Sequence, residues 1–399
     1  MVFSIFKRDS ILVFRLPEDD AANRRAWTIV IFLFVFLGGL TMQMRGPLVR
    51  TFRDVFIVSE SVLGLIAPAG SLSFVVSILI VGMRAGKIDF KKFLLLGTGL
   101  LSVFTFFVGI APTFTFVLLF LVGRGISNGV FRAIGRPILS HLYSNQRGRI
   151  FNLHSMAWAV GATIGPIFVS IILLLGSWRW AYFIPTFGFL IVFLMIIKLE
   201  LPQSSRREKI LSVEGLKKIL RNKFVLGVVG LIVLNGGVEG SFFTWLPYYA
   251  EQYFSGTIAN LSLSIYLASY IPGRYFYSRV SENWGYDRVI LLNASILVLT
   301  LLAAFVFTEG VLMMIFVLMT GFLISGNFPT ALALGTEHYP EHSAPINALT
   351  LSSSALGLSL FPALIGVIAD LYTINMAMLT PIFLMVGVFI LAFVMTRRE

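Results

Sequence analysis

The sequence predicts an all-α membrane protein with twelve transmembrane helices, arranged as two pseudo-symmetric bundles of six. Three observations lead to this fold class. The composition is strongly apolar, since 57% of the 399 residues are hydrophobic, only 13% are charged and the mean hydropathy is +0.89. Twelve apolar stretches are long enough to cross a bilayer, and the second half of the chain repeats features of the first. In soluble globular domains about a quarter of the residues are charged, so this composition excludes that class.

The twelve stretches are each about 19 to 28 residues long, enough for a helix to span the roughly 30 Å hydrocarbon core. We expect the spans at 27–49, 61–82, 92–110, 114–142, 150–175, 179–198, 224–250, 258–280, 288–307, 310–337, 345–370 and 374–396. The first span contains Gly46 and Pro47, which should bend or end the helix because proline lacks a backbone donor.

An internal repeat relates the two halves, because residues of the first half recur in the second at one constant spacing. The matched pairs include Tyr143 with Tyr339, Gly161 with Gly357, and Pro166 with Pro362. Two parallel copies of a six-helix unit form the architecture of secondary transporters, whose substrate site lies between the copies near the bilayer midplane. We therefore expect one bundle at 1–198, a cytoplasmic linker at 199–223 and a second bundle at 224–399.

The distribution of basic residues predicts the orientation. Lysine and arginine concentrate before the first span, near 84–92 and 147–149, and in the linker. By the positive-inside rule, both termini and the linker are cytoplasmic in a multi-pass protein of the cell membrane. The net charge of +12 is thereby explained by topology and by contact with anionic membrane lipid, and we expect no nucleic-acid partner.

Several kinds of chemistry are excluded. The chain has no cysteine, so it forms neither disulfides nor thiolate metal sites. No nucleophile and base constellation, phosphate-binding loop or redox signature is present, and we expect neither an enzyme nor a cofactor. The run 337–342, which contains two histidines and two glutamates, superficially suggests a metal site. Its repeat partner is an ordinary loop, so we expect no metal there.

Three segments carry a resemblance to a known family. Residues 161–166, Gly-Ala-Thr-Ile-Gly-Pro, resemble the glycine-proline motif of the fifth helix in the major facilitator superfamily. Residues 178–180, Trp-Arg-Trp, resemble the beginning of its sixth helix, and the loop 82–91 is a degenerate form of its gating motif. The resemblance covers almost the whole chain and implies the major facilitator fold.

The resemblance also implies a cytoplasmic gate. The loop after the second span contains Asp89 but has Gly86 where the family usually has an aspartate. The repeat-related loop keeps an acid, Glu282, in the corresponding place. We expect gate residues at Asp89, Arg274 and Glu282, with the gate depending more on Glu282 than on the first-half loop.

Within this superfamily, three patches look most like the fucose and glucose type of sugar:proton symporters. These patches are 149–154 leading into 161–162, then 236–247, and 326–330, which contains Asn327. The likeness implies proton-coupled symport of a sugar, with Asn327 among the substrate-binding residues. The fourth span departs from that branch because it carries Arg132 and Arg136.

Ionisable residues inside the spans are the candidates for function, since each costs about 2.5–3.5 kcal/mol at a helix centre and should face a cavity or a partner. At a closely similar offset of 200, which also matches Pro47 with Pro247, Arg45 has Trp245 as its repeat partner. The pseudo-twofold axis would then place a guanidinium and an indole on opposite walls of a substrate site. Alternatively, Arg45 reaches the lipid headgroups at the outer rim.

Three further arginines lie in the fourth predicted span. Arg132 and Arg136 are four residues apart and share a helix face, where like charges repel unless an acid or anion is near. They either bind substrate or join the topology and gate charges of the cytoplasmic end. Arg124 lies deeper, resembles in type and approximate place a helix-4 arginine of proton-coupled members, and is also a candidate for substrate binding.

Glu239 is the single acid well inside a predicted span, between Gly237 and Gly240. Removal from water favours the protonated form of a carboxyl group, so Glu239 is the candidate for proton coupling. The alternative is a fixed ion pair with an arginine of the opposite half. His154 stands at a predicted helix start, which favours a hydrogen-bonding role there over a proton relay.

Taken together, these patterns predict a secondary active transporter, acting as a monomer, that moves a small polar solute by alternating access with proton symport. The solute is a sugar, a sugar acid or another organic anion. One alternative is a proton-coupled multidrug efflux antiporter, although exporters of cations usually need an acidic cavity. Another is a non-transporting receptor or lipid-handling protein on the same scaffold.

Overall fold

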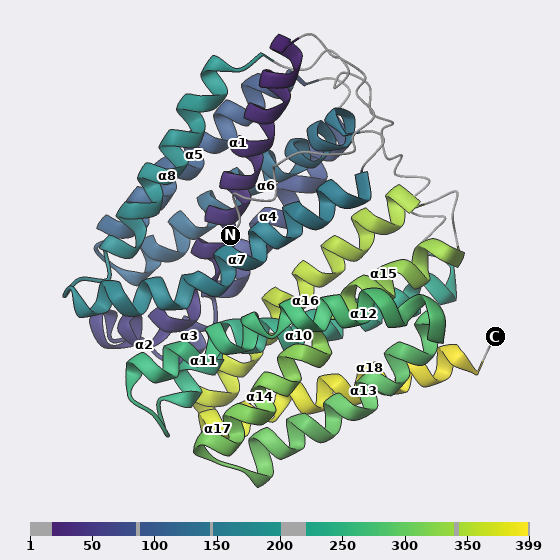
Figure 1. Ribbon diagram of the computed structural model, residues 1–399. Helices are drawn as coiled ribbons and strands as arrows, with labels where there is room; N and C mark the ends of the chain where they lie inside the picture. The colour runs from purple at the N-terminus through teal and green to yellow at the C-terminus, as the bar shows by residue number, and fades with distance from the viewer. Residues whose placement is uncertain (1–17, 85–87, 144–146, 201–220, 339–342, 398–399) are drawn as a thin grey trace.

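The computed structural model describes residues 18–84, 88–143, 147–200, 221–338 and 343–397. Within these residues the protein is helical and contains no β-strand. Figure 1 shows the helices in two groups, one coloured purple to teal and the other green to yellow, which we call the first and second bundles. Most of the predicted linker lies outside the described residues.

The helices follow the predicted spans closely. In the first bundle they are α1 (Glu18–Gln43), α2 (Arg45–Phe56), α3 (Glu60–Leu63), α4 (Ile66–Arg84), α5 (Phe90–Ile110), α6 (Phe114–Leu142), α7 (Arg147–Leu174) and α8 (Trp180–Lys198). In the second bundle they are α10 (Lys223–Ala250), α11 (Gly256–Ala268), α12 (Tyr270–Trp284), α13 (Tyr286–Leu302) with a π-helical turn η4 (Ala303–Phe307), α14 (Gly310–Ile324), α15 (Asn327–His338), α16 (Ser343–Leu371), α17 (Ile374–Ala377) and α18 (Thr380–Thr396).

Eleven segments of the described chain are long and apolar enough to cross a membrane. The predicted span 258–280 is not among them, and it is divided at Ser269 into α11 and α12, of 13 and 15 residues, the second of which is rich in polar side chains. Pro272, just after this division, lacks the backbone N–H of a regular helix. The two pieces follow one another and complete the twelve-helix fold.

The first predicted span is interrupted where its Gly-Pro pair predicted a bend. Helix α1 ends at Gln43 and α2 begins at Arg45, with Gly46 and Pro47 in the first turn of α2. A Cβ atom at Gly46 would lie 2.7 Å from the carbonyl oxygen of Phe243 in the other bundle. Glycine is required there because the two bundles touch at this point.

The repeat seen in the sequence has a counterpart in helix packing. A Cβ atom at Gly161 on α7 would overlap the carbonyl oxygen of Phe36 on α1. A Cβ atom at Gly357 on α16 would likewise overlap the carbonyl oxygen of Val233 on α10. Glycine therefore lets the fifth membrane-spanning helix of each bundle, α7 or α16, pack against the first, α1 or α10. Small residues are usual where helices pack closely in membranes.

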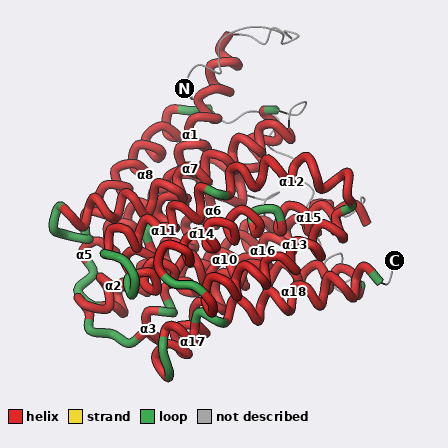
Figure 2. Tube along the Cα trace, turned by 60° about the horizontal axis from the view of Figure 1, so that its bottom comes forward, coloured by secondary structure: helices red, strands yellow, loops and turns green. Residues whose placement is uncertain are grey.

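The two ends of the molecule differ in how the bundles meet. We call the end where α1 begins, α8 ends and α10 begins the linker side, and the opposite end the distal side. Helices α2, α3 and α17 lie together at the distal side (Figures 1 and 2). Helices α2, α3, α4 and α7 of the first bundle contact α10, α11 and α16 of the second.

Polar contacts join the bundles at the distal side, and we call them the distal latch. They connect Arg50 with Glu251 at 2.7 Å, Arg53 with Tyr248 at 2.5 Å, Tyr248 with Glu60 at 2.7 Å, and Ser61 with Asp370 at 2.5 Å. At the linker side, α12 and α15 pack on helices of their own bundle and make no extensive contact with the first bundle in the described chain. The protein is therefore closed on its distal side.

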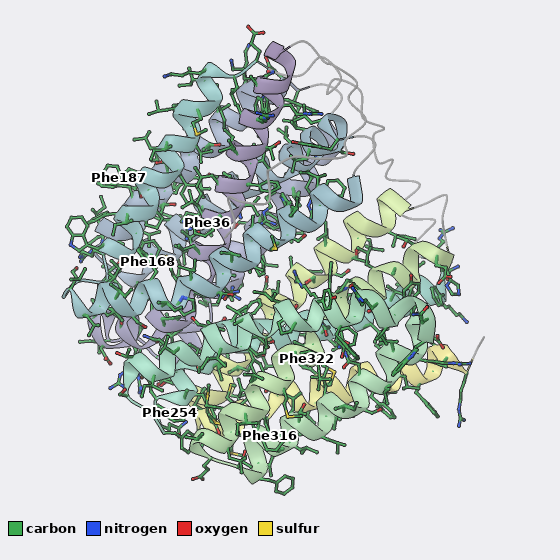
Figure 3. The ribbon with its side chains drawn as sticks, viewed as in Figure 1. Phe36, Phe168, Phe187, Phe254, Phe316 and Phe322 are labelled. Carbon is green, nitrogen blue, oxygen red and sulfur yellow. The ribbon has the colours of Figure 1, made fainter. Side chains whose placement is uncertain are left out.

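The outer surface of the bundles is apolar. Phe187 on α8 is 63% exposed and lies on the periphery of the first bundle (Figure 3), and Leu119 on α6 is 57% exposed. Exposed side chains of this kind, repeated along most helices, suit a lipid environment rather than water. The polar side chains that remain inside the bundles are the ones to consider for function.

Candidate functional site

Arg132 and Arg136 lie on one face of α6, and neither has a hydrogen bond or ion pair with a described residue. The Nε atoms of both side chains are buried and unpartnered. A Cβ atom at Gly38 on α1 would lie 3.9 Å from the terminal nitrogen Nη2 of Arg132. The guanidinium group of Arg132 therefore lies beside the backbone of α1.

His154 on α7 belongs to the same group of basic side chains. It is 3% exposed, its Nδ1 atom has no partner among the described residues, and the charges of Arg132 and Arg136 both act on it. Its ring meets Phe32 of α1 edge-on at 6.3 Å. The role predicted for His154 at a helix start is wrong, because α7 begins earlier, at Arg147.

Glu239 on α10 is held by hydroxyl groups instead of by an arginine. Its Oε1 atom accepts a hydrogen bond of 2.8 Å from Tyr270, whose hydroxyl is also bonded to that of Tyr266 at 2.9 Å. The positive charge that acts on Glu239 is Arg274, which lies over the Tyr270 ring in the same bundle. The alternative of an ion pair with the opposite half is thus not formed among the described residues.

The glycines beside Glu239 serve helix packing. A Cβ atom at Gly240 would lie 2.8 Å from the Cα atom of Leu358, and one at Gly237 would overlap the ring of Phe361. Both contacts are with α16. The glycines therefore bring α16 against α10, and they do not open a path for a ligand to Glu239.

The structure does not bring Arg45 and Trp245 together, and their role as opposite walls of a substrate site stays a prediction. Trp245 is fully buried, and its indole N–H donates to the carbonyl oxygen of Pro362 at 2.8 Å. Arg45 lies over the ring of Phe243 instead, with 5.9 Å from its Cζ atom to the ring centroid. Residues two apart on a helix differ in direction by about 200°, so only one of these two aromatic rings can face Arg45.

Arg45 is nevertheless unusual in its surroundings. It is 8% exposed, and its Nε and Nη2 atoms have no partner among the described residues. Gln43, just before it, is fully buried, and both polar atoms of its amide are also unpartnered. Sequence reasoning missed Gln43, although a glutamine next to a helix break in a membrane span was a signal that could have found it.

Asn327 belongs to a hydrogen-bond network inside the second bundle. Its amide nitrogen donates to Asn235 at 2.9 Å, and its oxygen accepts from Asn293 at 2.5 Å. Asn293 in turn accepts from Tyr277 at 2.7 Å. The polar atoms of Asn327 thus bind α10 and α13 to α15, and the structure does not direct them toward the other bundle.

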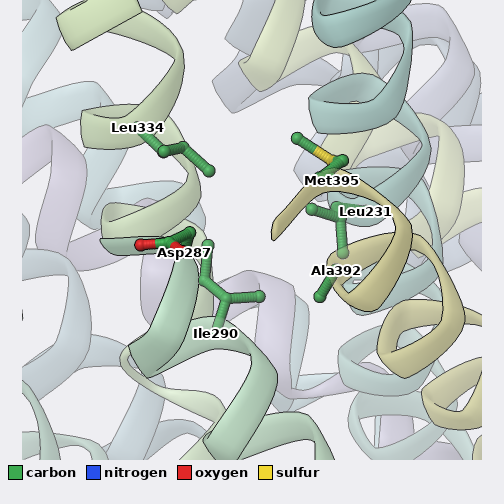
Figure 4. Close-up of a pocket in the computed structure, with 6 residues that line it drawn as sticks. All are labelled: Leu231, Asp287, Ile290, Leu334, Ala392 and Met395. Carbon is green, nitrogen blue, oxygen red and sulfur yellow. The ribbon is translucent and has the colours of Figure 1, made fainter. Parts of the chain in front are cut away.

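A small cavity lies near this network, between α10, α13, α15 and α18 (Figure 4). It is lined by Leu231, Asp287, Ile290, Leu334, Ala392 and Met395, and its volume is about 10 Å³. A single water molecule needs about 10–15 Å³. This cavity is therefore too small for a solute.

Arg124 is anchored inside the first bundle. Its Nε atom donates to the Thr105 hydroxyl on α5 at 3.0 Å, and its guanidinium lies over Tyr182 on α8. The structure does not bring it together with Arg132 and Arg136. Its role in substrate binding stays a prediction.

Of the three predicted gate residues, the structure describes the side chains of Asp89 and Arg274 and does not bring these two together. Asp89 caps α5 by accepting a hydrogen bond from the backbone N–H of Lys92 at 3.2 Å. Arg274 lies with Tyr270 and Glu239, and the side chain of Glu282 is outside those that the structure describes. Among the described residues, no group of three or more His, Cys, Asp or Glu side chains is arranged for a metal ion.

These features define the class of the protein. Two related helical bundles cross a membrane, meet along a seam that is closed at one end, and hold charged groups between their helices, as in a membrane transporter. The chain belongs to the Major Facilitator Superfamily, whose family model matches residues 31–257 and 250–399. The family predicted from the sequence motifs is confirmed, and the protein is a transporter and not an enzyme.

Individual relatives agree with this assignment. The chain is 24% identical over 371 residues to the protein TsgA homolog of Buchnera aphidicola subsp. Baizongia pistaciae (strain Bp), covering 90% of this chain and 92% of that protein. It is similar in fold to a bacterial homologue of the human lysosomal transporter Spinster in an inward-facing, unoccupied conformation, with a TM-score of 0.78, 15% identity and coverage of 94% and 97%.

A further structural relative is FucP, a fucose:proton symporter, in its outward conformation. The TM-score is 0.63 at 17% identity, and the match covers 93% of this chain and 99% of that one. At these identities the likeness shows the fold alone.

Proposed function

We propose that the protein is a secondary active transporter of the cell membrane that moves a small polar solute by alternating access. The solute is a sugar, a sugar acid or another organic anion, and the protein acts as a monomer in contact with membrane lipid. With the basic linker side in the cytoplasm, the state closed by the distal latch faces inward. The two bundles then rock about the central site to expose it to either side.

Proton coupling through Glu239 is the central part of this proposal. The observation that carries it is the partner of the carboxyl group, a tyrosine hydroxyl that can both donate and accept a hydrogen bond. Tyr270 can donate to the charged carboxylate, and it can accept from the protonated form while its own hydrogen turns toward Tyr266. An arginine partner offers donors only and would suit the charged form alone. Glu239 can therefore change protonation state without leaving an unsatisfied polar atom.

Drug efflux by proton antiport is the second candidate function. Export of cationic compounds usually needs acidic side chains in the cavity. Within the described spans the unpartnered charged groups are arginines, and Glu239 already has Tyr270 and Arg274 beside it. The charge distribution therefore favours a neutral or anionic solute over a cationic one.

The proposed function is tested by uptake into proteoliposomes with an imposed pH gradient, acidic outside. A panel of labelled sugars, sugar acids and carboxylates is compared with hydrophobic cations. We expect accumulation of a member of the first group above its external concentration, and loss of this accumulation when a protonophore is added. Accumulation that survives the protonophore contradicts proton coupling, and transport of the cations alone contradicts the solute class.

A further inference from the structure

Three basic side chains converge in the first bundle without a counter-charge. We call Arg132, Arg136 and His154 the basic triad. The ion pairs of the described chain involve Arg50, Arg53 and Lys92, so none of them includes a member of the triad. The triad is therefore a concentration of donors for which the described part of the protein supplies no acceptor.

This arrangement is costly by itself. A buried polar group without a hydrogen bond costs free energy, and like charges at adjacent positions on one helix face repel. Here the Nε atoms of both arginines and the Nδ1 atom of His154 are buried and unpartnered. An oxyanion near these side chains would offset this cost. Hydrogen bonds between an oxyanion and a guanidinium group are charge-assisted and stronger than those between neutral groups.

The direction of the Arg132 side chain is away from the lipid headgroups of the linker side. Helix α6 begins at the distal side and ends at the linker side, at Leu142. Side chains lean toward the N-terminus of their helix, so Arg132 and Arg136 lean toward the membrane interior. The position of Arg132 beside Gly38, in the interior part of α1, agrees with this direction.

An incoming group can reach the two arginines of the triad. Arg132 and Arg136 are half-buried and keep accessible surface, whereas His154 is enclosed. Gly38 has no side chain, which leaves the space next to the Arg132 guanidinium free of a Cβ atom. The three side chains come from two helices, α6 and α7, and approach a third, α1, as expected for a site formed by a bundle and not by one helix end.

We propose that the basic triad binds the anionic group of the transported solute, so that the substrate is an organic oxyanion, carrying a carboxylate or a phosphate. This inference rests on the proposed function and selects among its solutes. The two arginines bind the oxygens through charge-assisted hydrogen bonds, and a ring nitrogen of His154 completes the contact. The remainder of the solute faces the second bundle.

The test uses the full-length protein in nanodiscs of phosphatidylcholine, with the midpoint of thermal unfolding as the readout. The probes are glucuronate, glucose 6-phosphate and inorganic phosphate, with glucose as the matched neutral control. A ligand that binds the folded state raises the midpoint. We expect at least one oxyanion probe to raise it and glucose to leave it unchanged.

Substitutions locate the binding. Each of the substitutions Arg132→Gln, Arg136→Gln and His154→Asn should lower the affinity for the oxyanion probe, by about tenfold or more for the two arginines. Arg279→Gln, an exposed arginine of the second bundle, is the charge-matched control and should bind like the parent. Without probe, Arg136→Gln should unfold at a higher temperature than the parent, since the substitution removes an unpaired charge. A structural role would give a lower midpoint and an unchanged response to the probe.

The outcomes separate this inference from the proposed function. If no oxyanion raises the midpoint, or if the triad variants respond like the parent, the triad does not bind the solute. Transport of a neutral sugar that the triad variants leave intact overturns the inference and keeps the proposed function. Oxyanion binding at the triad without any transport keeps the inference and overturns the proposed function. If phosphatidylglycerol in the nanodiscs stabilises the parent but not Arg132→Gln, and the solutes do nothing, the anion is a lipid headgroup and the inference is wrong.

Discussion

Replacing Glu239 by glutamine is the sharpest test of proton coupling. The carboxyl oxygen accepts a hydrogen bond of 2.8 Å from the Tyr270 hydroxyl, and the amide oxygen of glutamine can accept the same bond. The side-chain shape is kept, but the group can no longer bind and release a proton. Glu239→Gln should therefore preserve solute binding and solute exchange while abolishing accumulation.

The expected size of the effect follows from the number of coupled protons. Glu239 is the single acidic residue well inside the predicted spans, so one proton per solute is expected. A pH difference of one unit is worth about 1.4 kcal/mol per proton, which supports roughly tenfold accumulation. Without a membrane potential this ratio does not depend on the charge of the solute, so the parent should approach it and Glu239→Gln should reach about one.

The assay compares the parent and Glu239→Gln in proteoliposomes with a pH difference of one unit, with the membrane potential clamped at zero. Exchange of labelled for unlabelled solute without a gradient shows whether each protein is folded and able to cycle. Glu337→Gln, an exposed glutamate at the end of α15, is the matched control and should accumulate like the parent. If Glu239→Gln also concentrates the solute about tenfold, Glu239 is structural and the coupling group lies elsewhere.

Three further predictions concern the helix packing, the polar network and the distal latch. Gly161→Ala and Gly357→Ala should each lower stability by about 1–3 kcal/mol, because their Cβ atoms overlap a neighbouring backbone; similar drops in the unfolding midpoint support the repeat, and no drop contradicts the packing. Asn327→Ala should lower the free energy of unfolding by about 1–3 kcal/mol, because it leaves the hydrogen-bond partners of Asn327 unsatisfied. A change in solute affinity without a loss of stability would instead show that Asn327 binds the solute. The latch is tested in protein carrying Leu263→Cys, which places a thiol at the closed distal seam. Adding Glu251→Gln should raise the rate of thiol labelling about twofold to fivefold, because it weakens the latch. Equal labelling rates would show that the latch does not hold the seam closed.

Much of the fold could be predicted from the sequence, because the length and hydropathy of each membrane span are properties of one continuous segment. The length and hydropathy of each stretch predicted where helices begin and end, and α6 has the predicted bounds 114–142. The Gly-Pro pair after Arg45 predicted the interruption of the first span. The span that met the prediction least well, 258–280, is also the one whose second half is most polar, so its division into two helices was only partly visible.

The candidate site was readable as a list of residues but not as an arrangement. The sequence identified Glu239, Arg132 and Arg136, because charged residues in apolar spans stand out. It did not identify Tyr270 as the partner of Glu239 or His154 as the neighbour of the two arginines. Both partners lie on other helices than the charged residues, and the whole of α11 stands between Glu239 and Tyr270 in the chain.

By itself, the sequence determined that this protein crosses the membrane as two related six-helix bundles with a few costly charges inside. Only the tertiary structure decided which way each charge faces. Trp245 and Phe243 differ by two positions, yet Trp245 binds Pro362 on α16 while Phe243 lies under Arg45. The rotation of a helix about its axis is set by its contacts with helices far away in the chain, such as the approach of α16 at Gly240. Hydropathy along one segment carries no information about those contacts.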